Sequence, residues 1–152
     1  MTEIRCTADI GGSAERIFDT IVDLPGYHRW LSRSAAYGGT TEISADPVTV
    51  GTTYFESGRG GIRHGRITEL ARPNTVTFHQ PMTLRTPPLG TIDIQVRYTL
   101  TPNGGSTHLD RHVTLTLNWL LRLLQPVLLP QFRKESERTV AALKAFVESS
   151  AE

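Results

Sequence analysis

An amphipathic segment near the end of the chain constrains the fold more than any other feature of the sequence. From about Trp119 to Glu148 the pattern is helical, and beyond Pro130 apolar residues recur every three or four positions, as in a helix with one buried face. We expect Pro126 and Pro130 to break or kink its first part. The stripe that must be buried comprises Leu129, Phe132, Ser136, Val140, Leu143 and Phe146.

Alternating segments upstream of this helix predict the sheet that it covers. Residues 91–101 and 107–117 alternate between apolar and polar side chains, which is typical of half-buried strands. Asn103-Gly104-Gly105 between them favours a tight hairpin. Further strands are expected at residues 3–10, 37–43 (with a bulge at Gly38-Gly39), 50–56, 62–71 and 75–80, and a longer loop at 81–90.

Two short helices are expected between the first two strands. Ser13 is a good N-cap for the first, whose apolar face carries Ile17, Phe18, Ile21 and Val22. Pro25-Gly26 ends it, and a second helical piece carries Tyr27, Trp30 and Leu31. The predicted fold is therefore α+β: a curved antiparallel sheet of about seven strands around a long C-terminal helix, enclosing an apolar pocket.

Bulk composition narrows the possible functions. A chain of 152 residues fits a single domain, residues 1–152, and its net charge of +1 supplies no general basic field for nucleic acid. The lone Cys6 and the N-terminal residues, which lack a signal-peptide pattern, favour the cytoplasm. Neither metal-ligand spacing among the five histidines nor a cofactor motif is recognisable, so no metal and no cofactor are expected.

The most apolar stretch, residues 113–130, is a poor transmembrane candidate. Asn118, Arg122, Gln125 and Pro126 interrupt it, so integral membrane association is not expected. A buried strand followed by a partly buried helix is the preferred interpretation. The alternative is an apolar lid that touches lipid or ligand.

Motifs along the whole chain carry a family resemblance. They are Ala14-Glu15-Arg16-Ile17-Phe18-Asp19, Val22-Asp23-Leu24-Pro25-Gly26-Tyr27-His28-Arg29-Trp30, Val50-Gly51-Thr52, Gly65-Arg66-Ile67-Thr68-Glu69-Leu70-Ala71-Arg72-Pro73, Tyr98-Thr99-Leu100-Thr101-Pro102, Gly105-Ser106-Thr107 and Leu143-Lys144. With these motifs the chain resembles the START-like, or Bet v 1-like (SRPBCC), superfamily, in particular its bacterial polyketide cyclase/dehydrase and lipid-transport-like group. The resemblance implies a helix-grip fold with a hydrophobic pocket, but no catalytic motif common to all members.

Arg111 is the polar residue of greatest interest. Its strand places it on the same face as Leu109 and Val113, toward the pocket. A buried guanidinium needs a partner. That partner is either a ligand carboxylate, phosphate or enolate oxygen, or an internal acid; a third possibility is that the guanidinium reaches water at the pocket mouth. Tyr98 also points inward, as a donor to a ligand oxygen or as a core aromatic residue.

Three functions are compatible with this sequence. The first is binding of a small hydrophobic molecule, such as a lipid, polyketide or aromatic metabolite, by a monomer or homodimer. The second is cyclase/dehydratase-type catalysis in the same cavity, with candidate catalytic residues Arg111, Tyr98 and His64. The third, least supported, is partner binding like that of chaperone co-activators. The predicted ligand-binding residues are Trp30, Phe55, Phe78, Val96, Tyr98, Arg111, Val113, Leu129, Phe132 and Ser136.

Overall fold

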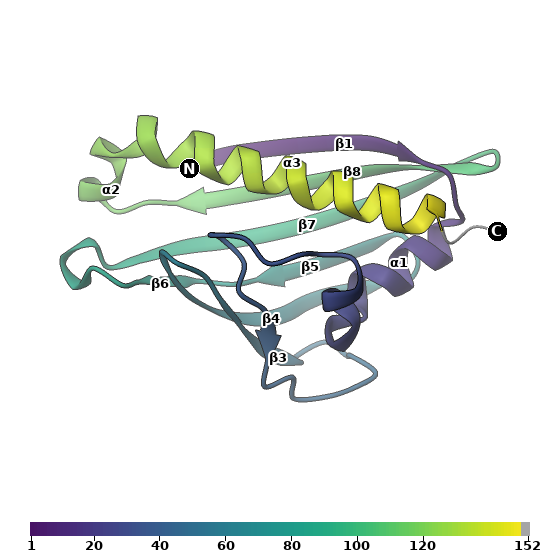
Figure 1. The fold of residues 1–152 in the computed structure, drawn as a ribbon, viewed down its shortest axis with the longest axis horizontal. Coiled ribbons are helices and arrows are strands. Elements are labelled where there is room, and N and C mark those ends of the chain that lie inside the picture. Colours follow the sequence, from purple (N-terminus) through teal and green to yellow (C-terminus); the bar gives the residue numbers. More distant parts are fainter. Residues whose placement is uncertain (150–152) are drawn as a thin grey trace.

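The computed structural model describes residues 1–149 and contains one antiparallel sheet and one long helix (Figure 1). The strands are β1 (Thr2–Ile10), β2 (Thr40–Thr41), β3 (Thr53–Ser57), β4 (Gly61–Ala71), β5 (Thr75–His79), β6 (Met82–Leu84), β7 (Thr91–Asn103) and β8 (Ser106–Thr116). The helices are α1 (Ala14–Val22), the 3-10 helices η1 (Leu24–Arg29) and η2 (Pro87–Leu89), α2 (Trp119–Leu123) and α3 (Gln125–Ser149).

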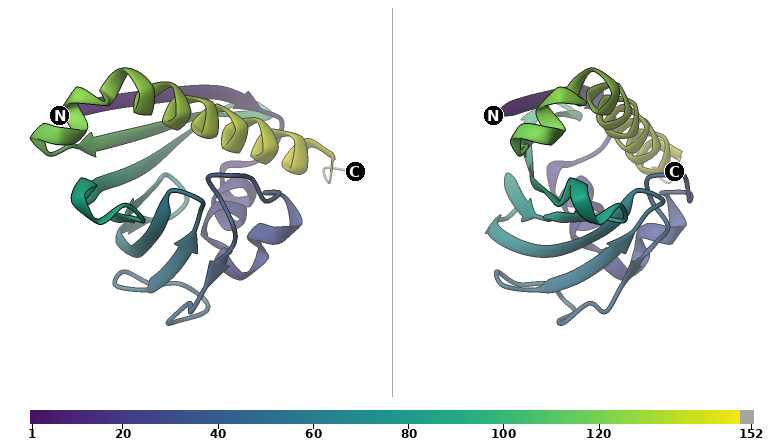
Figure 2. Two further views of the ribbon diagram at one scale, coloured as in Figure 1. Left: turned by 60° about the vertical axis from the view of Figure 1, so that its left-hand side comes forward. Right: turned by 90° about the vertical axis from the view of Figure 1, so that its left-hand side faces the viewer.

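The sheet curves around α3. Its strand order is β1-β8-β7-β5-β4-β3-β2, and β6 pairs with both β4 and β7. Helix α3 runs along the sheet beside β1, and the remaining strands curl beneath it (Figures 1 and 2). The predicted α+β class with a helix-grip arrangement and two short helices after the first strand is confirmed.

The pairing of β7 with β8 builds the inner face of the sheet. Alternate residues of β7, from Ile92 to Leu100, are buried, and so are Leu109, Val113 and Leu115 of β8. The register places Tyr98 opposite Arg111 on the two strands. Because side chains alternate across a strand, this register brings both polar side chains to the face that α3 covers.

The short helix α1 fills one end of the curved sheet. The Ser13 side chain accepts a hydrogen bond from the backbone of Arg16, as expected of an N-cap, at 3.2 Å. Ile17, Phe18 and Ile21 are all buried. They provide the apolar contact that holds α1 against the core.

The edge of the sheet differs from the prediction. The second strand is confined to Thr40–Thr41, because the positive φ angles of Gly39 and Glu42 interrupt an extended backbone on either side. The third strand is displaced to Thr53–Ser57 from the expected residues 50–56. The expected loop at 81–90 contains an additional strand, Met82–Leu84, and a 3-10 turn.

Proline affects the C-terminal helix less than expected. The helix is interrupted at Leu124, just before Pro126, but it continues across Pro130. Pro126 lies in the first turn of α3, where its missing N–H has no helical acceptor, and Pro130 removes one further bond. The predicted stripe is also wrong at its end, since Val147 is buried and Phe146 is only half-buried.

Gly65 allows a large aromatic side chain to lie flat on the sheet. It is paired with Tyr54 across β3 and β4, and a Cβ at position 65 would overlap the Tyr54 ring. Tyr54 is buried and donates a hydrogen bond of 2.7 Å to Gln80. A residue with a side chain at 65 would displace this ring.

We therefore expect Gly65→Ala to lower the free energy of unfolding by about 1–3 kcal/mol through overpacking. Gly105→Ala is the matched control, because no atom lies within 4 Å of a Cβ at that turn position. Urea denaturation of both variants measures the difference. Equal stability of the two variants would show that the Tyr54 ring can move at no cost.

Candidate functional site: a polar cavity under the C-terminal helix

A cavity of about 80 Å³ lies between the inner face of the sheet, η1 and α3. Residues from β3, β4, β5, β7 and β8 form one wall, and α3 forms the opposite wall. The lining residues are Leu24, Tyr27, Leu31, Tyr37, Tyr54, Glu56, Arg63, Phe78, Gln80, Ile94, Val96, Tyr98, Arg111, Val113, Phe132, Glu135, Ser136 and Thr139. This lining is aromatic and charged rather than uniformly apolar.

Arg111 joins the two walls of the cavity. Its Nε donates a hydrogen bond of 3.0 Å to the Tyr98 hydroxyl, and its Nη1 donates to Ser136 Oγ on α3. The guanidinium also lies over the Tyr98 ring, 5.6 Å from its centroid. Both hydrogen-bond partners are neutral. Within residues 1–149, no carboxylate forms an ion pair with Arg111.

Glu56 and Arg63 form a second polar group on β3 and β4. Their Oε2 and Nη2 atoms are 3.6 Å apart, and each side chain is only 11% exposed. Burial raises the pKa of the Glu56 carboxyl above its ordinary value, and the nearby Arg63 and Arg111 cations oppose part of that increase. The Glu56 carboxyl therefore binds a proton more readily than the carboxyl of an exposed glutamate does.

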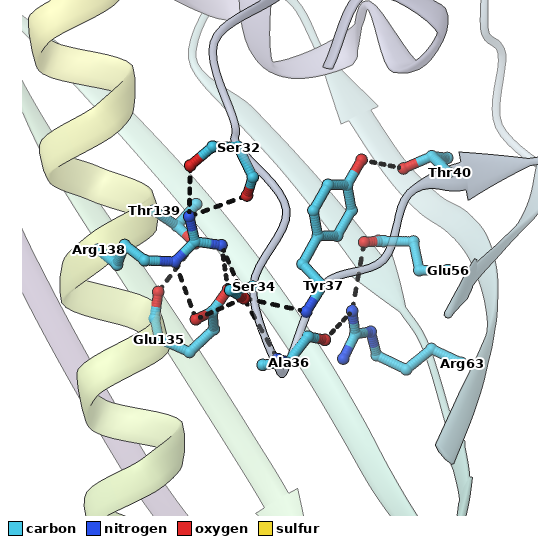
Figure 3. Close-up of polar contacts among 10 residues, drawn as sticks. All are labelled: Ser32, Ser34, Ala36, Tyr37, Thr40, Glu56, Arg63, Glu135, Arg138 and Thr139. Carbon is cyan, nitrogen blue, oxygen red and sulfur yellow. Dashed lines mark hydrogen bonds and ion pairs between the residues drawn. The ribbon is translucent and has the colours of Figure 1, made fainter. Parts of the chain in front are cut away.

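A third polar group attaches the 32–38 segment to α3. Arg138 bonds the carboxylate of Glu135 at 2.5 and 3.0 Å, and it also donates to the backbone oxygen of Ser32 at 3.0 Å and to Ser34 Oγ at 3.2 Å (Figure 3). On the other side, Arg63 donates to the backbone oxygen of Ala36 at 3.1 Å. These bonds hold Tyr37, which is buried, against the cavity.

The charges around the cavity do not cancel. Arg63 pairs with Glu56 and Arg138 pairs with Glu135, so each of these arginines has an acidic partner. Arg111 is the cation left over. The five side chains therefore carry a formal charge of +1 when both glutamates are ionised, and the excess lies on the group that lines the cavity.

Unused hydrogen-bond donors accompany this positive charge. A guanidinium has five N–H donors, and two of them on Arg111 form the bonds described. The Tyr98 hydroxyl accepts from Arg111, and no acceptor for its own hydrogen occurs in residues 1–149. In the same part of the chain the buried Nε of Arg63 also has no acceptor. The cavity is therefore suited to an oxygen that accepts several hydrogen bonds.

Most of the predicted site residues lie at this cavity. The structure brings together Phe78, Val96, Tyr98, Arg111, Val113, Phe132 and Ser136. They come from β5, β7, β8 and α3, which are far apart in the sequence.

Four predicted residues are not among those that line the cavity, and these placements are corrected. Phe55 and His64 face each other on the outer surface, with ring centroids 4.5 Å apart, because Tyr54 and Glu56 take the inward positions of β3. Trp30 packs against Tyr27, with the two rings tilted at 58° and their centroids 4.9 Å apart, beside a separate surface groove. Leu129 is half-buried and packs against the core instead.

Several lining residues escaped the sequence-based prediction, notably Glu56, Arg63 and Glu135. The prediction of Phe55 as a ligand-binding residue implies the opposite alternation for this strand, whereas the alternation that buries Tyr54 also buries Glu56. On α3 the helical spacing of Phe132, Glu135, Ser136 and Thr139 was available as a signal. The predicted stripe includes Phe132 and Ser136 but omits Glu135 and Thr139.

The sequence as a whole matches one protein-family model. Residues 1–148 match the model described as "Polyketide cyclase / dehydrase and lipid transport". The chain belongs to this family. The START-like, Bet v 1-like assignment made from the sequence motifs is thereby confirmed. No curated protein sequence matches the chain significantly.

Solved structures with the same fold are distant in sequence. A Mesorhizobium loti protein is 14% identical with a TM-score of 0.76, covering 99% of this chain and 100% of that one. Norcoclaurine synthase from Thalictrum flavum, with a transition-state analogue bound, is 13% identical with a TM-score of 0.77, covering 99% and 96%. The Aha1 dimer from Colwellia psychrerythraea is 16% identical with a TM-score of 0.70, covering 100% of both chains. These likenesses show a shared fold.

Residues 1–149 contain no group of three or more histidine, cysteine, aspartate or glutamate side chains placed to hold a metal ion. No helix in the same range combines the length and apolar character needed to cross a bilayer.

We expect the stability of the protein to depend on the ionisation of Glu56. Because its pKa is raised in the folded state, its contribution to the free energy of unfolding is fully present below the ordinary value of about 4.5 and is lost as pH rises through the folded-state pKa. The stability of the wild type relative to Glu56→Gln should therefore decrease with rising pH across that range, measured by urea denaturation. Glu69→Gln, on the outer surface, is the charge-matched control. A pH-independent difference would contradict the raised pKa.

Proposed function

We propose that the protein binds a small oxygenated organic molecule of the polyketide or aromatic class in this cavity, with a carbonyl or anionic oxygen held by Arg111 and Tyr98. The observation that carries the proposal is the unpaired cation of Arg111 beside unused donors. A charge-assisted hydrogen bond to a ligand oxygen is roughly twice as strong as a neutral one. This bond would also give the Arg111 guanidinium the negatively charged partner that it lacks within residues 1–149.

The remaining surface of the cavity suits the carbon skeleton of such a molecule. Phe78, Val96, Val113 and Phe132 supply apolar contact area, and burial contributes about 25 cal/mol per Å² of apolar surface removed from water. Phe78 and Tyr98 already form an edge-to-face pair at 6.2 Å. A planar ring can pack against these walls while its polar edge faces Arg111.

The size of the cavity limits the choice of ligand. Its volume of about 80 Å³ is well below the range of about 300–1,000 Å³ that pockets for drug-sized ligands enclose. A long acyl chain is thus the least suitable of the three ligand classes considered. Tyr37 of the 32–38 segment lines the cavity, and the side-chain hydrogen bonds from Arg63 and Arg138 restrain that segment against making room for larger molecules.

Binding can be tested with an isosteric pair of small aromatic probes, benzoate and benzamide. We expect the wild type to prefer benzoate by at least about tenfold, equivalent to about 1.4 kcal/mol, because only benzoate places a charge on Arg111. Arg111→Met should abolish this preference. Arg97→Met, which removes an arginine that pairs with Glu69 on the outer face, should retain it. NMR titration measures both affinities. Loss of the benzoate preference in both variants, or its absence in the wild type, would refute the proposal.

Catalysis is a second candidate function, favoured by the position of Glu56. A carboxyl with a raised pKa in the same cavity as Arg111 and Tyr98 can exchange a proton with a carbon next to a carbonyl, as a cyclase or dehydratase requires. His64, considered for this role from the sequence, lies on the outer surface. Glu56 replaces it as the proposed proton-transfer group.

Binding and catalysis differ in what happens to the ligand. Native mass spectrometry of protein purified from its own cells would reveal a co-purifying molecule, which can then be incubated with the protein in D₂O. We expect release with unchanged mass if the protein only binds. Uptake of deuterium at carbon, lost in Glu56→Gln, would establish proton transfer and favour the enzyme.

A further inference from the structure

An exposed apolar surface lies away from the cavity, on α2 and the first turn of α3. It is formed by Trp119, Leu123, Leu124 and Val127, whose exposed fractions are 75%, 69%, 37% and 60%. We call these four residues the α2 patch. Exposing large apolar side chains in one place is unfavourable in water and marks surfaces that meet another apolar phase. The patch lies at the end of the molecule where the chain begins (Figure 1).

Cations without acidic partners accompany the α2 patch. Arg122 lies within it, and Arg133 and Lys134 follow on α3; all three are exposed. None of them forms an ion pair within residues 1–149. No acidic residue occurs from Arg111 to Lys134. This segment is therefore both apolar and uniformly basic, although the whole chain carries a formal charge of only +1.

We propose that the α2 patch docks the protein peripherally on an anionic lipid bilayer. Amphipathic helices that combine Trp and Leu side chains with Arg and Lys lie in the interfacial plane of such bilayers. Trp119 would enter the headgroup region, where indole rings are favoured, and Leu123 and Val127 would reach the acyl boundary. Arg122, Arg133 and Lys134 would interact with the lipid phosphates and carboxylates.

Charge argues for a bilayer over a second copy of the chain. A two-fold symmetric dimer places the same surface of both subunits in contact. It would enclose Arg122 of both copies in one interface, with no carboxylate in the segment to neutralise the two cations. An anionic bilayer instead supplies the opposite charge. This proposal does not depend on the ligand of the cavity.

Vesicle sedimentation tests the proposal directly. We expect the full-length protein to bind vesicles of phosphatidylcholine with about one-third phosphatidylserine at least about tenfold more tightly than vesicles of phosphatidylcholine alone. The triple substitution Trp119→Ser, Leu123→Ser and Val127→Ser should abolish this binding. Val50→Ser with Ile62→Ser, which removes exposed apolar side chains elsewhere, should bind as the wild type does. Wild-type binding no tighter to the anionic vesicles than to the neutral ones would overturn the proposal.

Tryptophan fluorescence provides a second measurement that does not rely on the triple variant. The chain has two tryptophans, Trp30 and Trp119, so Trp30→Phe leaves Trp119 as the sole indole. We expect its emission to shift to shorter wavelength on anionic vesicles and to be quenched by brominated acyl chains. Unchanged emission would overturn bilayer insertion. A mass corresponding to two chains in free solution, reduced to one chain by Trp119→Ser, would assign the patch to self-association instead.

Discussion

A curved sheet with one open side requires something to cover its inner face, and in this protein α3 provides that cover. The buried residues Ser136, Val140, Leu143 and Val147 of α3 face the sheet, while alternate residues of β7 and β8 face α3. The cavity lies between these two layers, and several of its groups depend on both. Arg111 is the clearest case, because it bonds Tyr98 on the sheet and Ser136 on the helix.

The arginines around the cavity have two different roles. Two of them hold the surrounding structure in place, and the third lines the cavity where a ligand can bind. Arg63 and Arg138 each have a glutamate partner and also bond the 32–38 segment. Ion pairs of this kind contribute little net stability, since desolvation offsets most of their attraction, so the bonds to the 32–38 segment are their clearer structural role. Within residues 1–149 Arg111 lacks such a partner, and this difference separates it from the two structural arginines.

Helix α3 changes character along its length. Its first turn exposes Val127 beside the basic residues, whereas later turns are buried against β1 and the inner face of the sheet. The interruption at Leu124 allows α2 to project its apolar side chains outward instead of continuing the buried stripe. One continuous segment, α2 with α3, thereby forms both an exposed apolar surface and one wall of the cavity.

Local pattern was sufficient for most of the fold. Alternation along residues 91–101 and the hairpin at Asn103-Gly104-Gly105 placed Tyr98 and Arg111 on the inner face, because a tight turn leaves one register for the two strands. The short edge strands could not be predicted in the same way, since a segment of two or three residues has no measurable period. Strand β6 depends on neighbours on both β4 and β7.

The sequence by itself determined the sheet, the long helix and the inward position of Arg111, since these follow from periodicities that the backbone geometry imposes. Only the tertiary structure decided that no acid meets Arg111 within residues 1–149 and that Arg138 holds the 32–38 segment. Glu56 faces Arg63 across one hairpin and Glu135 precedes Arg138 by three residues, so these ion pairs are local, whereas the 32–38 segment reaches Arg138 across about 100 residues of chain. Such meetings depend on how the sheet curves and where α3 crosses it, and no local pattern encodes that. The missing acid beside Arg111, on which the proposed function rests, became visible only when these partners were placed.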